Sequence, residues 1–194
     1  MVSKAPFSIE TKGGVVNAQV LENGALVKVE MGIVSFASSK IPVLGKSRDV
    51  LLETLNLDGK QIVYSAATIG NPHCVVMNEN PSESLAREIG SQLEIHPNFP
   101  HRTNVQFMKI LDRNRIQIEI WERGAGYTLA SGSSSCASAA VARKLGLCEK
   151  NIIVSMPGGN INIEVNENFS VTMSGAVTAI CNGEISLECL SQII

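Results

Sequence analysis

The sequence predicts a mixed α/β (α+β) protein in which short, mostly antiparallel strands outnumber two clear helices. Apolar and polar residues alternate along most segments, and pairs such as Asn-Gly and Asp-Gly separate these segments. Two stretches show helical periodicity instead. The 194 residues are 44% hydrophobic and 18% charged, a globular composition that excludes an intrinsically disordered chain.

The amino-terminal third is expected to form strands joined by tight turns. Alternation predicts strands at 7–11, 15–21, 25–31 and 61–68. Turns are expected at Gly13-Gly14, Asn23-Gly24 and Asp58-Gly59, because these residues readily adopt the positive φ of hairpin turns. Residues 50–57 are ambiguous by pattern.

A first helix is expected after Pro81, where the spacing of the apolar residues changes. Ser82 is suited to cap its amino terminus. The apolar stripe of this helix consists of Leu85, Ala86, Ile89 and Leu93. Beyond it, alternation predicts strands at 104–111, 115–121, 152–156, 160–165, 170–174, 176–181 and 184–190.

The central stretch, residues 115–147, changes period twice. A strand ends in a charged turn that holds Glu122 and Arg123, and a Gly/Ser loop at 131–135 then runs into a helix at 136–143. The side chains of this second helix are unusually small, which suits a helix enclosed by other elements. Its amino terminus directs unpaired backbone N–H groups and a positive dipole at the loop, where carboxylates and phosphates bind. The alternative is a surface loop that caps an ordinary helix.

A second polar segment, GNPHCVV at residues 70–76, lies between two apolar strand-like runs. Asn71 precedes a proline and is therefore biased toward an extended or turn conformation that can present its amide outward. His73 is the candidate titrating group, with an ordinary pKa near ~6.5. The alternative is a turn with a structural, hydrogen-bonded histidine. His96 and His101 lie among prolines and are predicted to be loop residues.

Charge and cysteine usage exclude several functions. A net charge of −2 without a basic block argues against nucleic acid or an anionic membrane as partner. No apolar run reaches the roughly 20 residues of a membrane span, and the first residues lack a signal-peptide core. Five cysteines without CxxC spacing predict reduced thiols in a cytoplasmic protein. The histidines and cysteines show no zinc-ligand spacing, so no metal site is expected.

Three motifs carry a resemblance to a known family: GNPHCVV at 70–76, TNVQF at 103–107 and WERGAGYTLASGSSSCA at 121–137. In this order and spacing they closely resemble diaminopimelate epimerase. The resemblance extends from about Ile9 to about Leu187, through MPGGNINIEV and MSGAVTAICNGEI.

The resemblance implies a pyridoxal-independent amino-acid isomerase of lysine biosynthesis, which needs no cofactor and acts on a small, diaminopimelate-like amino acid. In such enzymes one cysteine thiolate removes the α-proton and a second thiol protonates the opposite face. The implied fold has two α/β domains, each a curved sheet around a central helix, with substrate between them.

The family's site residues are carried over position by position. Backbone amides of Gly132 and Ser133 would bind the α-carboxylate. His73 and Glu122 would orient the catalytic groups. The carboxylate at the far end of the substrate would be bound by Asn71, Asn104 and Arg123.

The sequence departs from the family pattern in three places. Ser131 stands where the family has a catalytic cysteine, and a hydroxyl ionises far less readily than a thiol at a helix amino terminus. Cys136 matches a second, non-catalytic cysteine of the motif and is not promoted to a base. The GNGxR-type loop with the other catalytic cysteine is not found, and Tyr127 replaces a glutamate.

The expected domain organisation follows from the missing loop. Residues 31–175 would form a complete carboxy-terminal epimerase-like domain. Residues 1–30 would be a remnant of the first domain, and 176–194 would be strands that return to it. Exposed strand edges of this kind favour association with another chain, such as a second copy.

Three functions remain open at this point. The first is a diaminopimelate epimerase-type isomerase, impaired by Ser131 and inactive as this chain alone. The second is a non-catalytic homologue that binds an amino acid or a partner chain. The third is a racemase or dehydratase that acts on another amino acid, with Ser131 as the acid.

Overall fold

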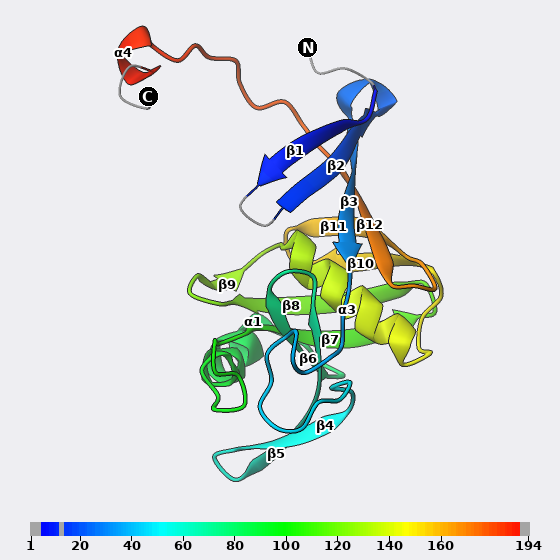
Figure 1. The fold of residues 1–194 in the computed structure, drawn as a ribbon, viewed down its shortest axis with the longest axis vertical. Coiled ribbons are helices and arrows are strands. Elements are labelled where there is room, and N and C mark those ends of the chain that lie inside the picture. The colour runs from blue at the N-terminus through cyan, green and yellow to red at the C-terminus, as the bar shows by residue number, and fades with distance from the viewer. Residues whose placement is uncertain (1–4, 12–13, 191–194) are drawn as a thin grey trace.

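The structure is a computed structural model that describes residues 5–11 and 14–190. Within these residues the strands form one sheet curved around a central helix, α3 (Gly132–Lys144), as Figure 1 shows. The strands of the sheet are β1 (Phe7–Thr11), β2 (Gly14–Leu21), β3 (Leu26–Ile33), β4 (Glu53–Leu57), β5 (Lys60–Thr68), β6 (Pro72–Met77), β7 (Asn104–Asp112), β8 (Arg115–Glu122), β9 (Gly126–Thr128), β10 (Asn151–Met156), β11 (Gly159–Val165) and β12 (Ser170–Ala176). The short helical pieces are η1 (Glu22–Gly24), α1 (Glu83–Leu85), η2 (Ala86–Gly90), α2 (Ser91–Glu94) and α4 (Leu187–Leu190).

Strand order confirms the predicted mixed class. The sheet runs β1-β2-β3-β12-β11-β10-β8-β7-β6-β5-β4, with β9 paired to β8. Within this sheet, only β6–β7 and β8–β10 pair in parallel, and every other pair of described strands is antiparallel. The Asp58-Gly59 turn is confirmed, because both residues have positive φ, 50° and 87°. Gly13 of the first predicted turn lies outside the described residues.

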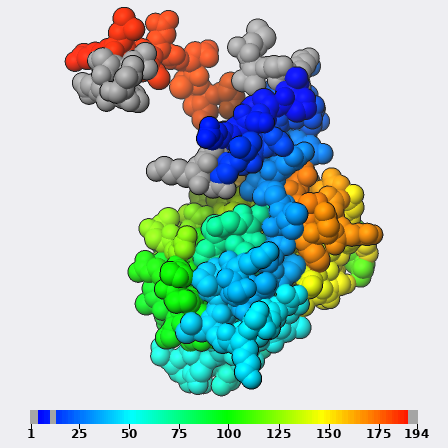
Figure 2. Space-filling view, viewed as in Figure 1, coloured from blue at the N-terminus to red at the C-terminus, as the bar shows by residue number. Residues whose placement is uncertain are grey.

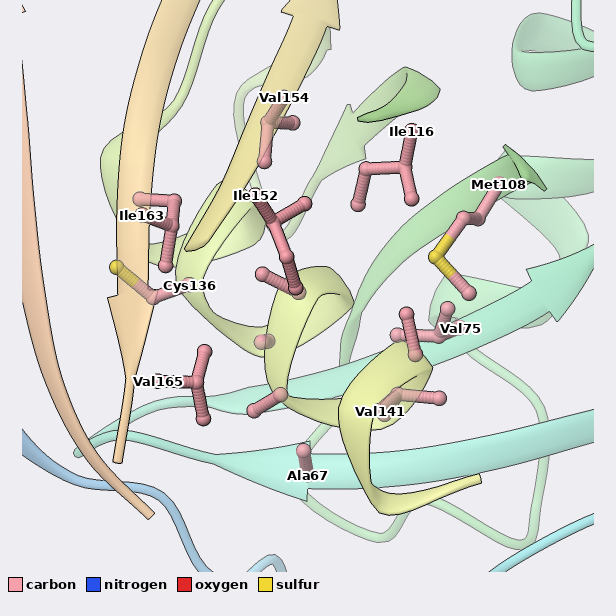
Figure 3. Close-up of a cluster of buried hydrophobic side chains, with 14 of the residues drawn as sticks. Ala67, Val75, Met108, Ile116, Cys136, Val141, Ile152, Val154, Ile163 and Val165 are labelled. Atoms are coloured by element: carbon pink, nitrogen blue, oxygen red, sulfur yellow. The ribbon is translucent and has the colours of Figure 1, made fainter. Parts of the chain in front are cut away.

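Helix α3 is enclosed, as its small side chains predict. Residues 134–142 are all buried. Figure 3 shows apolar side chains of the sheet, including Ile116, Ile152 and Val165, gathered around Cys136 and Val141 of the helix. Each fully buried Ile or Val contributes roughly 1.5–3 kcal/mol. This packing fixes the amino terminus of α3 relative to the sheet.

The helix predicted after Pro81 is present but irregular. Its apolar stripe is confirmed, and Oγ of Ser82 accepts the N–H of Leu85 at 3.2 Å as a cap. The middle of the segment, η2, is a π-helical turn. Ser91 Oγ donates to the carbonyls of Arg87 and Glu88, which competes with regular helical bonding there.

Gly90 ends η2 at a close approach to the sheet. A Cβ at this position would lie 2.8 Å from Cβ of Trp121, so the helical segment approaches β8 only because the residue is glycine. The second buried cluster lies beneath this segment and includes Tyr64, Leu93 and Phe107. The ambiguous residues 50–57 contribute β4 to its border.

The amino-terminal hairpin and the carboxy-terminal tail lie outside the main body (Figure 2). Strand β3 joins the hairpin to the body by pairing with β12. The strands predicted at 176–181 and 184–190 are wrong: residues 177–186 have no regular structure, and 187–190 form α4. Alternating residues form a strand only beside a hydrogen-bonding neighbour, and no described strand pairs with this segment. Among the described residues, no helix is long and apolar enough to cross a membrane.

Candidate functional site

The candidate site lies where three strands meet the amino terminus of α3. The parallel strands β6 and β7 begin at this edge, and β8 ends there. His73 pairs with Asn104 across the parallel pair. Segments far apart in sequence therefore bring the GNPH, TNV and ERG motifs together at one end of the central helix.

Asn71 links the sheet to the helix. Its Nδ2 donates to Oγ of Ser133 at 3.3 Å, and its Oδ1 lies 3.0 Å from Nε2 of His73. The amide, the imidazole and the first turn of α3 are thus held in one hydrogen-bonded row. Because Asn71 precedes proline, its backbone is kept out of helical conformations and its side chain is directed across the site.

His73 is fully buried, and burial governs its charge. Loss of solvent lowers the pKa of His73 to about 3, the neighbouring Gln106 side chain opposes this fall, and the positive charge of Arg123 adds to it. The ring is therefore neutral at neutral pH. The ordinary value near ~6.5 belongs to a solvated ring, and burial moves the pKa of His73 away from it.

Ser131 caps α3. Its Oγ accepts the N–H of Ser134 at 3.4 Å, and its carbonyl accepts the N–H of Ser135 at 3.1 Å. By helix geometry, the amides of Gly132 and Ser133 come before the first intrahelical donor, the N–H of Ser135, and so have no acceptor within the helix. These two N–H groups and the helix dipole form an anion-attracting end. A Cβ on Gly132 would lie 2.9 Å from Sδ of Met173, so the end of this flexible side chain would have to shift.

Asn104 and Arg123 are joined through the backbone. Asn104 Nδ2 donates to the carbonyl of Pro72 at 2.8 Å, and Asn104 Oδ1 accepts the N–H of Arg123 at 3.0 Å. The Arg123 guanidinium is exposed, with Nη1 donating to the carbonyl of His101 at 3.0 Å. Asn104 therefore fixes the turn from which an exposed cation projects. Glu122, half-buried, is the last residue of β8 and immediately precedes that turn.

Glu94 fixes the other side of the same turn, and pattern analysis missed it. Its carboxylate is 6% exposed and accepts the indole N–H of Trp121 at 2.6 Å and the N–H of Gly124 at 3.0 Å. Arg102 forms an ion pair with it at 3.2 Å. No local signal distinguishes a buried glutamate at the end of a helix from an exposed one, so only the structure assigns this role.

Gln106 is the second residue that sequence analysis missed. It is fully buried on β7, and its Nε2 donates to Oγ of Ser134 at 3.0 Å. Its position in the TNVQF motif placed it near the site, but its burial follows from the packing of β7 beneath α3.

Asn71 borders a groove of about 690 Å³. One wall is the Ile69–Asn71 turn, and the other is formed by β2 and β3, with Asn17 and Glu30 among the lining residues. Asn71 therefore lies between the buried row of hydrogen bonds and space open to a ligand.

Cys136 belongs to the hydrophobic core. Cys136 is buried within α3, where loss of solvent raises the pKa of its thiol to about 12. A buried thiol of this kind is inert as a base near neutral pH. Within residues 5–11 and 14–190, no cluster of three or more His, Cys, Asp or Glu side chains is arranged to hold a metal ion.

Tyr127, which replaces the expected glutamate of the family motif, lies on β9 opposite Trp121. Its hydroxyl donates to the buried carboxylate of Glu119 at 2.8 Å, and Arg87 lies 4.8 Å from the centre of its ring. Burial and this hydrogen bond raise the pKa of Tyr127 to about 12. The substitution therefore satisfies a buried carboxylate on β8.

Sequence comparisons agree with the motifs. The family model described as diaminopimelate epimerase matches residues 65–180. Diaminopimelate epimerase 2 of Nostoc sp. (strain PCC 7120) is 55% identical over 188 residues, which cover 97% of this chain and 66% of that protein. The diaminopimelate epimerase of Caldanaerobacter subterraneus subsp. tengcongensis is 37% identical over 96% of this chain and 69% of its own length. The chain thus spans about two thirds of the length of these relatives.

Structural comparisons identify the same kind of fold at much lower identity. A probable proline racemase from Agrobacterium radiobacter K84 matches with a TM-score of 0.70 at 15% identity, over 96% of this chain and 62% of that one. A predicted epimerase from Pseudomonas aeruginosa matches with a TM-score of 0.63 at 15% identity, over 93% of this chain and 66% of that one. These similarities establish the epimerase-like fold, with its curved sheet around a central helix.

Proposed function

Because the chain belongs to the diaminopimelate epimerase family, we propose that it binds the substrate of a cofactor-independent amino-acid isomerase of lysine biosynthesis. The reaction is inversion at the α-carbon of a diaminopimelate-like amino acid. The observation that carries the proposal is the hydrogen-bonded row from His73 through Asn71 to Ser133, which ends at the amino terminus of α3.

The amino terminus of α3 is the proposed site for the α-carboxylate. The amides of Gly132 and Ser133 would donate to it. Removal of the α-proton leaves a carbanion beside the carboxylate, and its negative charge spreads toward these amides. A fixed dipole then stabilises the transition state without reorganisation.

The far carboxylate of the substrate is assigned to the Arg123 turn. The guanidinium is exposed and always charged, so it suits a second carboxylate with two parallel hydrogen bonds. Asn71 and Asn104 flank it in the proposed site. Two anion-binding positions select a dicarboxylic amino acid over a simple one.

Ser131 is the proposed proton donor or relay on one face of the α-carbon. Its Oγ already accepts a backbone N–H, so its own proton remains available for donation. A hydroxyl is a weak base, and we expect Ser131→Cys to restore a thiolate that the helix dipole stabilises. His73, neutral, and Glu122 are proposed to orient the reacting groups.

We also propose the division of the chain into residues 1–30, 31–175 and 176–194, with the outer two belonging to a first epimerase domain. The hairpin and tail stand apart from the body, which supports this division. The outer edge of β1 lacks a partner among the described strands and suits pairing with another copy. Light scattering at increasing concentration tests this association, and a monomer at all concentrations contradicts it.

Solvent deuterium exchange tests the function. The purified chain is incubated with LL-diaminopimelate in D₂O and the α-proton is followed by NMR, alongside Ser131→Cys and the exposed helical control Ser91→Cys. We expect faster exchange with Ser131→Cys than with the native chain or the control. Binding without exchange in any variant would favour a non-catalytic amino-acid-binding homologue. Exchange with another amino acid alone would favour a different racemase.

A further inference from the structure

Two buried polar atoms next to the site lack a hydrogen-bond partner among the described residues: Nδ1 of His73 and Oε1 of Gln106. Both side chains are fully buried. The parallel register pairs His73 with Asn104, and Gln106 lies two residues further along β7, so both side chains project from the same face of the sheet. The Gln106 side chain lies close enough to the ring to act on the pKa of His73, although no hydrogen bond joins the two side chains in the described structure. Burial makes such unpaired atoms costly.

The other end of the Gln106 carboxamide lies against α3. Its Nε2 donates to Oγ of Ser134 at 3.0 Å, and the backbone N–H of Ser134 donates to Oγ of Ser131. Gln106 therefore bridges the imidazole and the first turn of the helix. Asn71 makes the second such bridge, from the other ring nitrogen to Ser133.

A half-turn of the carboxamide about its last bond satisfies both unpaired atoms. Nε2 of Gln106 then donates to Nδ1 of His73, and Oε1 accepts the hydroxyl proton of Ser134. The bond to Ser134 is kept, because a serine hydroxyl either donates or accepts. The arrangement requires the proton of the neutral ring at Nε2, which already faces Oδ1 of Asn71.

The donors and acceptors then run in one direction. Ser134 donates to Gln106, Gln106 to His73, His73 to Asn71, and Asn71 to Ser133. With its oxygen held by the ring, Asn71 turns its NH₂ group toward Ser133 and the groove. An amide nitrogen carries two N–H donors, so this orientation presents a donor to a carboxylate.

We propose that Gln106 is a positioning residue that fixes His73 as the Nε2–H tautomer and thereby orients the Asn71 amide toward an anionic ligand. The assignment of the His73 tautomer does not depend on the reaction, whereas the binding of a substrate carboxylate by the Asn71 amide rests on the proposed function.

Histidine NMR tests this proposal without activity. The chain has three histidines, so ¹⁵N-histidine labelling gives few signals, and couplings to the carbon-bound ring protons identify which nitrogen carries hydrogen. We expect His73 in the native chain to carry its proton on Nε2 at neutral pH. We also expect coupling across a hydrogen bond between Nε2 of Gln106 and Nδ1 of His73.

Gln106→Glu tests the cause. A carboxylate cannot donate to Nδ1, so we expect the proton of His73 to move to Nδ1 or the ring to become doubly protonated. Gln92→Glu is the matched control, since Gln92 is bound to a helix carbonyl away from the site, and it should leave the His73 signals unchanged.

Two outcomes overturn the proposal. One is a native His73 that carries its proton on Nδ1, a result that needs no variant and stands even where Gln106→Glu fails to fold. The other is a folded Gln106→Glu protein with the native tautomer. If His73 carries its proton on Nε2 but the chain catalyses no deuterium exchange, the proposed function is contradicted and the positioning role of Gln106 stands.

Discussion

The indole N–H of Trp121 donates to the buried carboxylate of Glu94 at 2.6 Å, which links the end of α2 to the end of β8. The other carboxylate oxygen accepts the N–H of Gly124. One side chain therefore determines both where the strand ends and how the turn that carries Arg123 begins.

Glu94→Gln is expected to destabilise the fold. The amide keeps one acceptor and replaces the other with a donor that faces an N–H group. An unsatisfied buried group costs about 1–3 kcal/mol, and we expect a loss of this size in the free energy of unfolding. Urea denaturation followed by the fluorescence of Trp121, the single tryptophan, measures it. Glu88→Gln on the exposed face of the same helical segment is the control, and equal stability of the two variants would contradict the role of Glu94.

Arg123→Ala is expected to weaken diaminopimelate binding without unfolding the protein. The guanidinium is exposed, so its loss leaves the core unchanged. A hydrogen bond to a charged group contributes about 1.5–3 kcal/mol, which corresponds to a roughly 10- to 150-fold rise in the dissociation constant. Isothermal calorimetry measures this change. Arg113→Ala is the control, because it removes an exposed arginine that pairs with Glu149 at the opposite end of β8 from Arg123. A similar loss of binding in that variant would mean that the assigned site is wrong.

His73 is expected to make the protein less stable in acid. The pKa of His73 is lowered to about 3 in the folded state, while the unfolded ring titrates near ~6.5. Between these values the unfolded state binds one more proton, so the free energy of unfolding falls as the pH drops through this window. Urea denaturation from pH 7 to pH 4 measures the slope. His73→Gln should reduce it by about one proton, whereas His101→Gln on the exposed loop should not.

Tyr127→Glu, which restores the residue usual in the family motif, is expected to destabilise this protein more than Tyr127→Phe. Phenylalanine removes the hydroxyl that donates to Glu119 and leaves this buried carboxylate without its donor, a loss of about 1–3 kcal/mol. Glutamate places a second carboxylate against Glu119, and like charges repel. Adding Glu119→Gln to Tyr127→Glu should recover stability in urea denaturation. No recovery would mean that the two side chains do not interact.

Most of the fold was predictable from local patterns. Alternation identified the strands at 7–11, 104–111 and 152–156, and in the last of these, β10, one face is buried while the other is not. The strands predicted in the carboxy-terminal tail were wrong, because alternation indicates which face of a strand could be buried and does not indicate whether a neighbouring strand exists. The π-turn at Ala86–Gly90 was also unpredicted, since it arises from contact with Trp121 and from the Ser91 hydroxyl.

The sequence by itself determined the small-sided helix and the order of the motifs, because each depends on neighbours a few residues away. It did not determine where the helix begins: residues 132–135, predicted as a loop, form the first turn of α3, and Ser131 is its cap. Only the tertiary structure decided the charge of His73 and the roles of Gln106 and Glu94. Burial depends on residues distant along the chain, and burial sets both the cost of charging a ring and the cost of leaving a polar atom unpaired. A histidine that the sequence predicts to titrate therefore becomes a neutral link between two amides.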